Sequence, residues 1–197
     1  MTPKYFLELG DIMARVEASD ATLAPIAYDE GIRRATVIVR DQTAAGRKVI
    51  FVGNGGSAAI ASHQAVDYWK NGGMRAIAFN DPALLTCVGN DFGYPHVFEK
   101  PIAMFADAGD VLIAISSGGR SENILRAVDA GVAAGCRVIT LSGFRPDNPL
   151  RTRGELNFYA PSDSYGYVEI THLAVCHCIV DTIMADRAAG APTSRTR

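Results

Sequence analysis

The sequence contains little cysteine and no marked excess of charge of either sign. Its cysteines, Cys87, Cys136, Cys176 and Cys178, follow neither the spacing of a zinc ribbon nor that of a disulfide framework. Most of them lie in apolar stretches, so we expect reduced, buried thiols in a cytoplasmic protein. The formal net charge is −2 at pH 7, which leaves no basic footprint for nucleic acid. A nucleic-acid partner is therefore not expected.

Long apolar runs are also missing. No uninterrupted run approaches the ~20 residues that span a bilayer, and the first residues have too short an apolar core for a secretory signal. We therefore expect neither a membrane partner nor export. What the chain does have is hydrophobic content, 48% over 197 residues, which suits one compact domain with a substantial core.

Short apolar segments rich in β-branched residues alternate with segments of helical period. The strand candidates are 48–52, 75–79, 111–115, 137–141 and 156–160, and the helix candidates are 3–18, 20–45, 57–71, 96–106, 121–134 and 168–187. This alternation predicts an α/β fold in which a five-stranded parallel sheet is flanked by helices on both faces, with extra N-terminal helices.

We expect a single domain over residues 1–188, with N-terminal helices in 1–45 and the α/β core and last helix in 46–188. The first helices precede any strand that they could connect. They would therefore pack on one face of the sheet or against another subunit. The tail 189–197 lacks apolar periodicity and is expected to be disordered.

The first candidate site is the turn Gly53-Asn-Gly-Gly56, which follows a buried strand. Ser57 comes next and reads as the cap of a helix. A strand that leads through glycines into a helix offers free backbone N–H groups to an anion. The motif is neither a Walker loop nor a dinucleotide fingerprint. A plain connection between strand and helix is the alternative.

A second turn repeats this pattern. The segment Ser116-Ser-Gly-Gly-Arg-Ser121 follows another buried strand and precedes another helix. Its hydroxyls can donate to phosphate oxygens, and its glycines let the backbone approach closely. A serine-rich cap with Arg120 in solvent is the alternative. Because ligands of parallel sheets bind beyond the carboxyl ends of the strands, both turns should face one crevice.

Four ionisable side chains on two helices could do chemistry. His63 and Asp67 are four apart and share a helix face, whereas Glu169 and His177 are eight apart, ~12 Å along a helix axis. Two imidazoles and two carboxylates that meet would suit a divalent metal, with zinc the best match. They would equally make a general acid–base pair. Alternatively, each histidine is an ordinary core or interface residue.

Three further polar residues are less informative. His172 adds a polar group to the apolar last helix and needs a partner there. His96 reads as structural. Asp91 follows a short helix in a turn that closes at Gly93, where it is either a plain cap or a ligand of sugar hydroxyls.

These motifs together resemble a known family. They are Gly53-Asn-Gly-Gly-Ser57, His63, Cys87-Val-Gly-Asn-Asp-Phe-Gly93, Gly109-Asp-Val-Leu and Ile115-Ser-Ser-Gly-Gly-Arg-Ser121. In combination they closely resemble the sugar isomerase (SIS) domain of phosphoheptose isomerases, over nearly the whole chain.

The resemblance implies a three-layer SIS sandwich that converts sedoheptulose 7-phosphate to D-glycero-D-manno-heptose 7-phosphate through an enediol. That reaction leads to activated heptose for surface polysaccharide. It also implies a homotetramer with one zinc ion per subunit, terminal helices in the subunit contacts and active sites near the interfaces.

The resemblance assigns roles to several residues. Positions that the family uses around the sugar phosphate are occupied by Asn54, Gly55, Ser57, Ser116, Ser117 and Ser121, and its acidic sugar-contacting position by Asp91. Its zinc ligands correspond to His63, Asp67, Glu169 and His177, of which Asp67, Glu169 and His177 would also carry the proton transfers.

The chain departs from the family pattern at three positions. Asp67 replaces a longer glutamate, Glu169 replaces a glutamine, and Gly118 replaces a hydroxyl residue of the second turn. Two other functions therefore stay open. One is a non-catalytic SIS protein that binds a replication initiator, as some relatives of this family do. The other is an isomerase of a different phosphosugar.

Overall fold

The computed structural model describes residues 2–190. A seven-stranded sheet forms its middle layer, with the strand order β2-β1-β7-β6-β5-β3-β4. The strands are β1 (Glu17–Ser19), β2 (Pro25–Ile26), β3 (Val49–Gly53), β4 (Ala76–Ala78), β5 (Val111–Ser116), β6 (Arg137–Ser142) and β7 (Leu156–Tyr159). The five strands from β7 to β4 are parallel to one another, as predicted, whereas β1 and β2 add an antiparallel edge.

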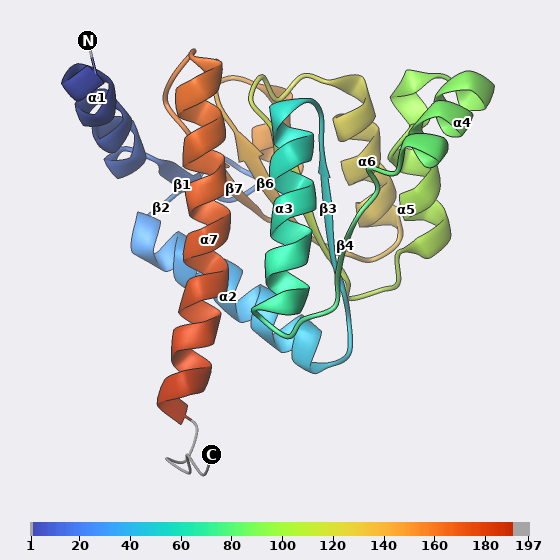
Figure 1. Ribbon diagram of the computed structural model, residues 1–197, viewed down its shortest axis with the longest axis horizontal. Helices are drawn as coiled ribbons and strands as arrows, with labels where there is room; N and C mark the ends of the chain where they lie inside the picture. The colour runs from blue at the N-terminus through green and yellow to red at the C-terminus, as the bar shows by residue number, and fades with distance from the viewer. Residues whose placement is uncertain (1, 191–197) are drawn as a thin grey trace.

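Helices cover both faces of the sheet (Figure 1). They are α1 (Thr2–Ala14), α2 (Tyr28–Ala44), α3 (Gly56–Lys70), α4 (Pro82–Phe92), α5 (Glu99–Phe105), α6 (Glu122–Ala133) and α7 (Tyr165–Gly190), with short 3₁₀ turns η1 (Tyr94–His96) and η2 (Pro149–Thr152). One apolar core lies between the sheet and α2, α3 and α7, and a second between the sheet and α5 and α6. The three-layer α/β architecture is therefore confirmed.

The two expected N-terminal helices differ from those in the structure. Between α1 and α2, β1 pairs with β7 and turns back into β2. Asp20 stabilises this turn, since its carboxylate accepts hydrogen bonds from the backbone N–H groups of Thr22 and Ala24 at 2.8 and 3.1 Å. Pro25 has no N–H and cannot continue a helix. Antiparallel pairing therefore replaces helix in residues 17–26.

The expected turn around Asp91 is instead the last part of α4. Asp81 caps this helix, because its carboxylate accepts from Ala83 N and Leu84 N at 2.9 and 3.0 Å. Pro82 follows at the first helical position, where proline is favoured. The helix continues through Asp91 and ends at Gly93, whose φ is +87°.

Helix α7 is long and apolar enough to cross a membrane by length and composition alone. This was not predicted from the sequence, because only uninterrupted apolar runs were considered and polar residues interrupt this helix. It packs along α2 and α3 beside the sheet (Figure 1). Residues that recur along it are buried in the core, namely Val168, Thr171, His172, Val175, Cys176, Ile179, Val180 and Ile183. This packing accounts for the buried 44% of its most apolar 18-residue window.

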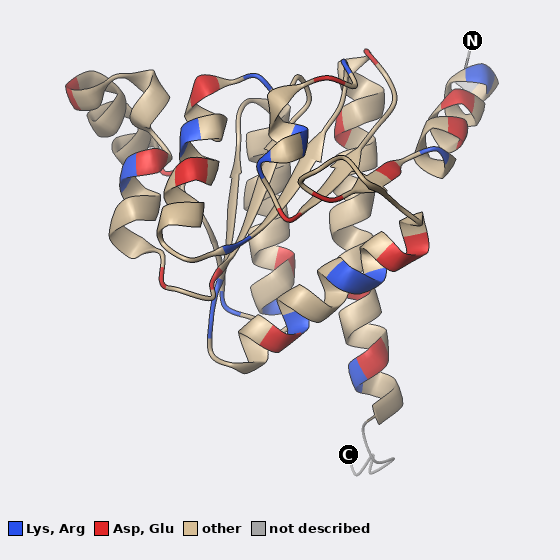
Figure 2. Ribbon diagram, turned by 180° about the vertical axis from the view of Figure 1, so that it is seen from behind, with Lys and Arg blue, Asp and Glu red and all other residues tan. Residues whose placement is uncertain are grey.

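Two other predictions concerned the burial of the cysteines and the C-terminal tail. Cys87 and Cys178 are exposed and only Cys176 is fully buried, so the prediction of buried thiols is wrong for most of them. Residues 191–197 of the expected tail lie outside the described residues, and 189–190 belong to α7. Basic and acidic residues are interspersed over the part of the chain that the structure describes (Figure 2).

Candidate functional site

Both glycine turns line one cavity of about 490 Å³ at the carboxyl edge of the sheet, as the parallel arrangement predicts. The first turn joins β3 to α3 and the second joins β5 to α6, and these two strands are neighbours. The lining residues are Asn54, Gly55, Gly56, Ser57, Ser116, Ser117, Gly118, Arg120, Ser121, Phe144, Arg145, Tyr165 and Glu169.

The first turn leaves backbone donors for an anion. Helix α3 begins at Gly56, and Gly55 precedes it with φ +54° and no side-chain cap. Ser57 therefore lies inside the first turn of α3 rather than at its cap. The first N–H groups of a helix have no partner within that helix, and the helix dipole favours negative charge there. The open start of α3 thus suits a phosphate group.

Glu169 also approaches this turn. A Cβ on Gly56 would overlap the Glu169 carboxylate, so a larger residue there would displace the carboxylate from this position. The contact brings the carboxylate of Glu169, from α7, to the N-terminus of α3, and Glu169 lines the cavity. A carboxylate is electrostatically favoured at a helix N-terminus. Glu169 therefore belongs to the end of the site that would hold the phosphate.

The second turn presents hydroxyl groups to the same cavity. Ser116 Oγ accepts a hydrogen bond from Gly119 N at 3.2 Å, which leaves its proton free to donate. The Ser117 hydroxyl is buried and has no hydrogen-bond partner among the described residues. Ser121 precedes α6 without using its side chain as a cap. Buried hydroxyls normally have partners, so these groups suit an anionic ligand.

A reciprocal amide pair connects the first turn to α6. Asn54 Nδ2 donates to Asn123 Oδ1 at 2.9 Å, and Asn123 Nδ2 donates to Asn54 Oδ1 at 2.8 Å. Asn54 Oδ1 also accepts from the Tyr94 hydroxyl at 2.9 Å. The Asn54 side chain thus has protein partners on both its amide atoms. In the structure it links the first turn to α6, which the sequence did not reveal because Asn123 lies 69 residues away.

We expect Asn54→Ala and Asn123→Ala to weaken binding of inorganic phosphate at the two turns by similar factors, roughly five- to tenfold each, because either change removes the same pair of hydrogen bonds. The double variant should be little worse than either single one. Binding measured by titration calorimetry on the four proteins checks this. A much larger effect of Asn54→Ala alone would instead mean that Asn54 contacts the ligand directly.

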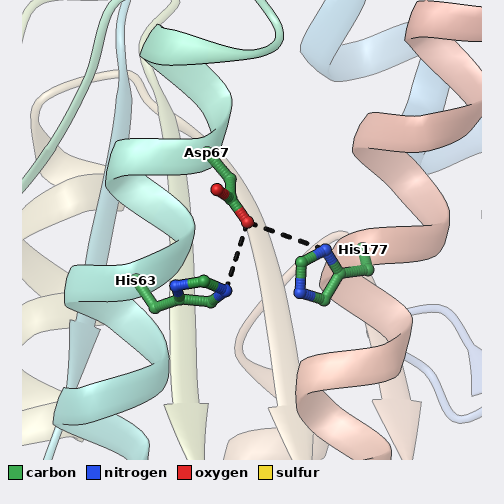
Figure 3. A group of neighbouring side chains, drawn as sticks. All are labelled: His63, Asp67 and His177. Atoms are coloured by element: carbon green, nitrogen blue, oxygen red, sulfur yellow. Dashed lines mark ion pairs between the residues drawn. The ribbon is translucent and has the colours of Figure 1, made fainter.

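A second group of candidate side chains, His63, Asp67 and His177, lies between α3 and α7 (Figure 3). Asp67 Oδ2 is 3.2 Å from His63 Nε2 and 3.7 Å from His177 Nδ1. One ligand atom from each of the three residues lies within 4.8 Å of the others. Asp67 Oδ1 accepts a hydrogen bond from Asn71 Nδ2 at 3.1 Å, which orients the carboxylate with Oδ2 toward the imidazoles. Two nitrogen donors and one carboxylate make a donor set that suits zinc.

The predicted group of four is therefore only partly assembled. Glu169 lies by Gly56 and not with the other three. The rise of 1.5 Å per residue explains this, since eight residues separate it from His177 on one helix. His63, Asp67 and His177 in turn do not line the cavity.

Two other sequence candidates lie outside both groups. Asp91 is exposed on α4, where its carboxylate accepts hydrogen bonds from Asn90 and Cys87 rather than lining the cavity. His172 is buried, and its Nε2 donates to Ser142 O at 2.9 Å. Burial lowers the pKa of His172 to about 4, so it is neutral at pH 7 and acts as a core residue. His96 is paired with Glu99 at 2.6 Å, which agrees with a structural role.

Several cavity residues were missed by the sequence reasoning. Arg145, Phe144 and Tyr165 come from segments without a recognisable motif, and they reach the cavity only through the fold. The arrangement as a whole offers uncharged donors and cations for an anionic group. Further along α3, the imidazoles of His63 and His177 and the carboxylate of Asp67 could serve proton transfer or metal binding.

Known proteins are similar to this chain over most of its length. The SIS domain family matches residues 4–143. A phosphoheptose isomerase of Klebsiella pneumoniae is 36% identical over 190 residues, which are 90% of this chain and 98% of that protein. One of Enterobacter sp. is 37% identical over 183 residues, covering 87% and 95% of the two chains.

Solved structures are similar as well. The phosphoheptose isomerase of Neisseria gonorrhoeae superposes with a TM-score of 0.82 at 28% identity, over 93% of this chain and 97% of that one. The phosphoheptose isomerase of Francisella tularensis gives 0.81 at 27% identity, over 93% and 96%. The chain therefore belongs to the SIS-domain family and, within it, to the phosphoheptose isomerases.

Proposed function

We propose that this protein converts sedoheptulose 7-phosphate to D-glycero-D-manno-heptose 7-phosphate in the cytoplasm, as the entry to activated heptose for surface polysaccharide. The observation that carries the proposal is that one helix, α3, brings together a candidate phosphate site and a candidate proton-transfer site. The open N-terminus of α3 belongs to the cavity with the two donor turns, and the His63–Asp67–His177 group lies further along α3.

The phosphate group binds at the two turns. Backbone N–H groups at the start of α3 and the hydroxyls of Ser57, Ser116, Ser117 and Ser121 supply the hydrogen bonds. Ser57 and Ser117 are 4% and 6% exposed, so the phosphate exchanges water for fixed donors in a partly enclosed site. This binding sets the register of the sugar along α3.

The carbonyl end then lies near His177 and Asp67. Six residues separate Ser57 from His63, about 9 Å along the helix, and a seven-carbon chain can bridge this distance. The isomerisation removes a proton from C1 of the ketose and returns one at C2, while a second proton moves between the two oxygens. Asp67 is the carboxylate at this end and exchanges the carbon-bound proton, and His177 serves the oxygens. Glu169 contacts the first turn and orients the substrate.

The three-residue group also suits a zinc ion, one per subunit. Its donor set of two imidazoles and a carboxylate is that of catalytic zinc sites, which keep a further position open. His63 is 54% exposed at its side chain and His177 36%, so an additional ligand can approach. When bound, zinc would polarise the sugar carbonyl. Glu169 is not close enough to be a fourth ligand from the same chain.

We propose that the protein is a homotetramer, because exposed apolar residues lie on α3 beside the His63–Asp67–His177 group and on α1. Val66 and Trp69 on α3 are 45% and 54% exposed, and Phe6 and Leu7 on α1 are 64% and 76% exposed. Exposed apolar side chains that lie next to each other on a surface mark contact sites. A second subunit placed against α3 would cover the solvent-facing side of His63 and His177.

The proposed function is tested by incubating the purified protein with sedoheptulose 7-phosphate, with and without added zinc, and following the aldose product. We expect turnover and about one bound zinc per chain by elemental analysis. A panel with hexulose phosphates tests the alternative substrate. Absence of turnover on the whole panel would contradict an enzymatic role and favour the non-catalytic protein that binds a replication initiator.

A further inference from the structure

Two arginines from different loops reach the cavity that holds the donor turns. Arg120 belongs to the turn between β5 and α6, and Arg145 to the loop between β6 and η2. Both approach one carboxylate oxygen, because Arg120 Nη2 is 3.4 Å and Arg145 Nε 3.2 Å from Asp147 Oδ1. Two guanidinium groups thus share a single anion, and the cluster retains one positive charge.

An anionic ligand can displace Asp147 from the two arginines. The side chains of Arg120, Arg145 and Asp147 are 56%, 74% and 64% exposed, and exposed ion pairs contribute little net free energy. The Arg145 hydrogen bond and the nearby charges of both arginines lower the pKa of Asp147, so it is ionised at neutral pH. A phosphate dianion carries more charge and accepts bidentate hydrogen bonds from guanidinium. It therefore competes well with one carboxylate.

The loop that carries Arg145 is rigidly supported. Asn148 Nδ2 donates to Gly143 O and Arg145 O at 3.2 and 2.8 Å, and the Tyr159 hydroxyl donates to Phe144 O at 2.7 Å. Arg151 Nη1 donates to Pro146 O at 3.0 Å. Successive carbonyl groups of the loop therefore have fixed donors, and the backbone under Arg145 is held in place.

The two arginine-bearing loops are also joined to each other. Leu150 N donates to Gly119 O at 3.2 Å. Gly119 has φ +62°, and a Cβ there would overlap the Asn148 side chain, so glycine is required for this close packing. The relative position of Arg120 and Arg145 is thus determined by backbone contacts and not by their exposed side chains.

Two aromatic rings, Phe144 and Tyr165, line the cavity together with the arginines, and Phe144 lies next to Gly118 of the second turn. A Cβ on Gly118 would be 3.6 Å from the Phe144 ring. Phe144 has φ +57°, unusual for a bulky residue, and it packs edge to face on Tyr165 at 4.8 Å between ring centroids. Aromatic packing and two cations thus lie beside Gly118, where the second turn has no side chain.

We propose that Arg120 and Arg145 form a cationic rim that binds the phosphate group of the substrate, and that Asp147 competes with this phosphate for both guanidinium groups. The inference takes from the proposed function only that the ligand is a phosphorylated sugar. The rim supplies charged donors beside Gly118, which has no side chain of its own to donate. It makes phosphate affinity dependent on salt and selects strongly for phosphorylated over free sugars.

Binding of inorganic phosphate to the purified protein, measured by titration calorimetry at low and high salt, tests the rim. Arg120→Gln and Arg145→Gln should each weaken binding roughly tenfold at low salt and reduce its salt dependence. Asp147→Asn should tighten binding about threefold, because it removes the competing anion and leaves both arginines charged. Sedoheptulose 7-phosphate should show the same order of variants.

The matched control is Arg126→Gln, since Arg126 is an exposed arginine on α6 that pairs with Glu122 and does not line the cavity. It should bind phosphate as the unchanged protein does. Equal affinity of Arg120→Gln, Arg145→Gln and the control, or weaker binding by Asp147→Asn, would overturn the proposal. Because phosphate binding needs no turnover, an inactive protein with the expected order of affinities would contradict the isomerase function and leave the rim supported.

Discussion

Replacing His177 with alanine should lower kcat/KM for sedoheptulose 7-phosphate by roughly 10²–10⁴-fold, the usual contribution of a positioned acid–base group. His177 comes from α7 and Asp67 from α3, and their contact at 3.7 Å brings the two helices' functional groups together. In the proposed reaction the His177 imidazole serves both sugar oxygens, because an imidazole ring can donate and accept a proton. Its loss also removes one of three candidate zinc ligands.

Steady-state kinetics, zinc content and phosphate affinity of His177→Ala separate these effects. Phosphate affinity should be unchanged, because the donor turns lie at the other end of the site. Cys178→Ser is the matched control, since Cys178 is the exposed neighbour on the same helix and should keep full activity. Turnover by His177→Ala within about threefold of the unchanged protein would exclude His177 from the proton transfers.

The parallel part of the sheet could be predicted because its middle strands are uninterrupted apolar runs. All residues of β3 and β5 are buried, and strands covered on both faces read as continuous hydrophobic segments. The short edge strands could not be predicted this way. β1 and β2 have three and two residues, too few for any period to show, and they form only because β7 presents a partner edge.

The candidate site could be predicted where its geometry follows from one element. The spacing of His63 and Asp67 fixes a shared helix face, and strand polarity places both turns at the same edge of the sheet. The site could not be predicted where it depends on packing between elements. Helix spacing alone does not tell that Glu169 contacts Gly56 or that Arg145 reaches the loop of Arg120. The first contact arises from the packing of α7 on α3 and the second from the way two loops lie beside each other, and no local sequence pattern encodes either.

Asp110→Ala should lower the free energy of unfolding by about 3–5 kcal/mol, the usual effect of breaking a buried ion pair from one side. Asp110 is 1% exposed and lies just before β5. Its Oδ1 accepts from Lys48 N at 2.9 Å, and its Oδ2 accepts from Asp107 N at 2.8 Å and from Lys48 Nζ at 2.5 Å. One carboxylate thus joins the amino ends of β3 and β5.

The charge state of Lys48 agrees with this role. Burial alone would lower its pKa, but hydrogen bonds to Asp110 and Asp107 outweigh burial and raise the pKa of Lys48 above its ordinary value. In Asp110→Ala the ammonium keeps only the exposed Asp107 as a partner, and two backbone N–H groups lose their acceptor. Leaving such groups unsatisfied costs more than the hydrogen bonds contribute in the folded state.

Urea unfolding at one fixed protein concentration measures the effect, because subunit association would otherwise shift the apparent stability. Asp41→Ala is the matched control, since Asp41 pairs with Arg40 on the surface of α2, and it should unfold close to the unchanged protein. Asp110→Asn should lie between the two, because an amide oxygen still accepts one bond but its NH₂ group opposes the Lys48 ammonium. A loss below about 1 kcal/mol in Asp110→Ala would mean that water replaces the carboxylate at the amino ends of β3 and β5.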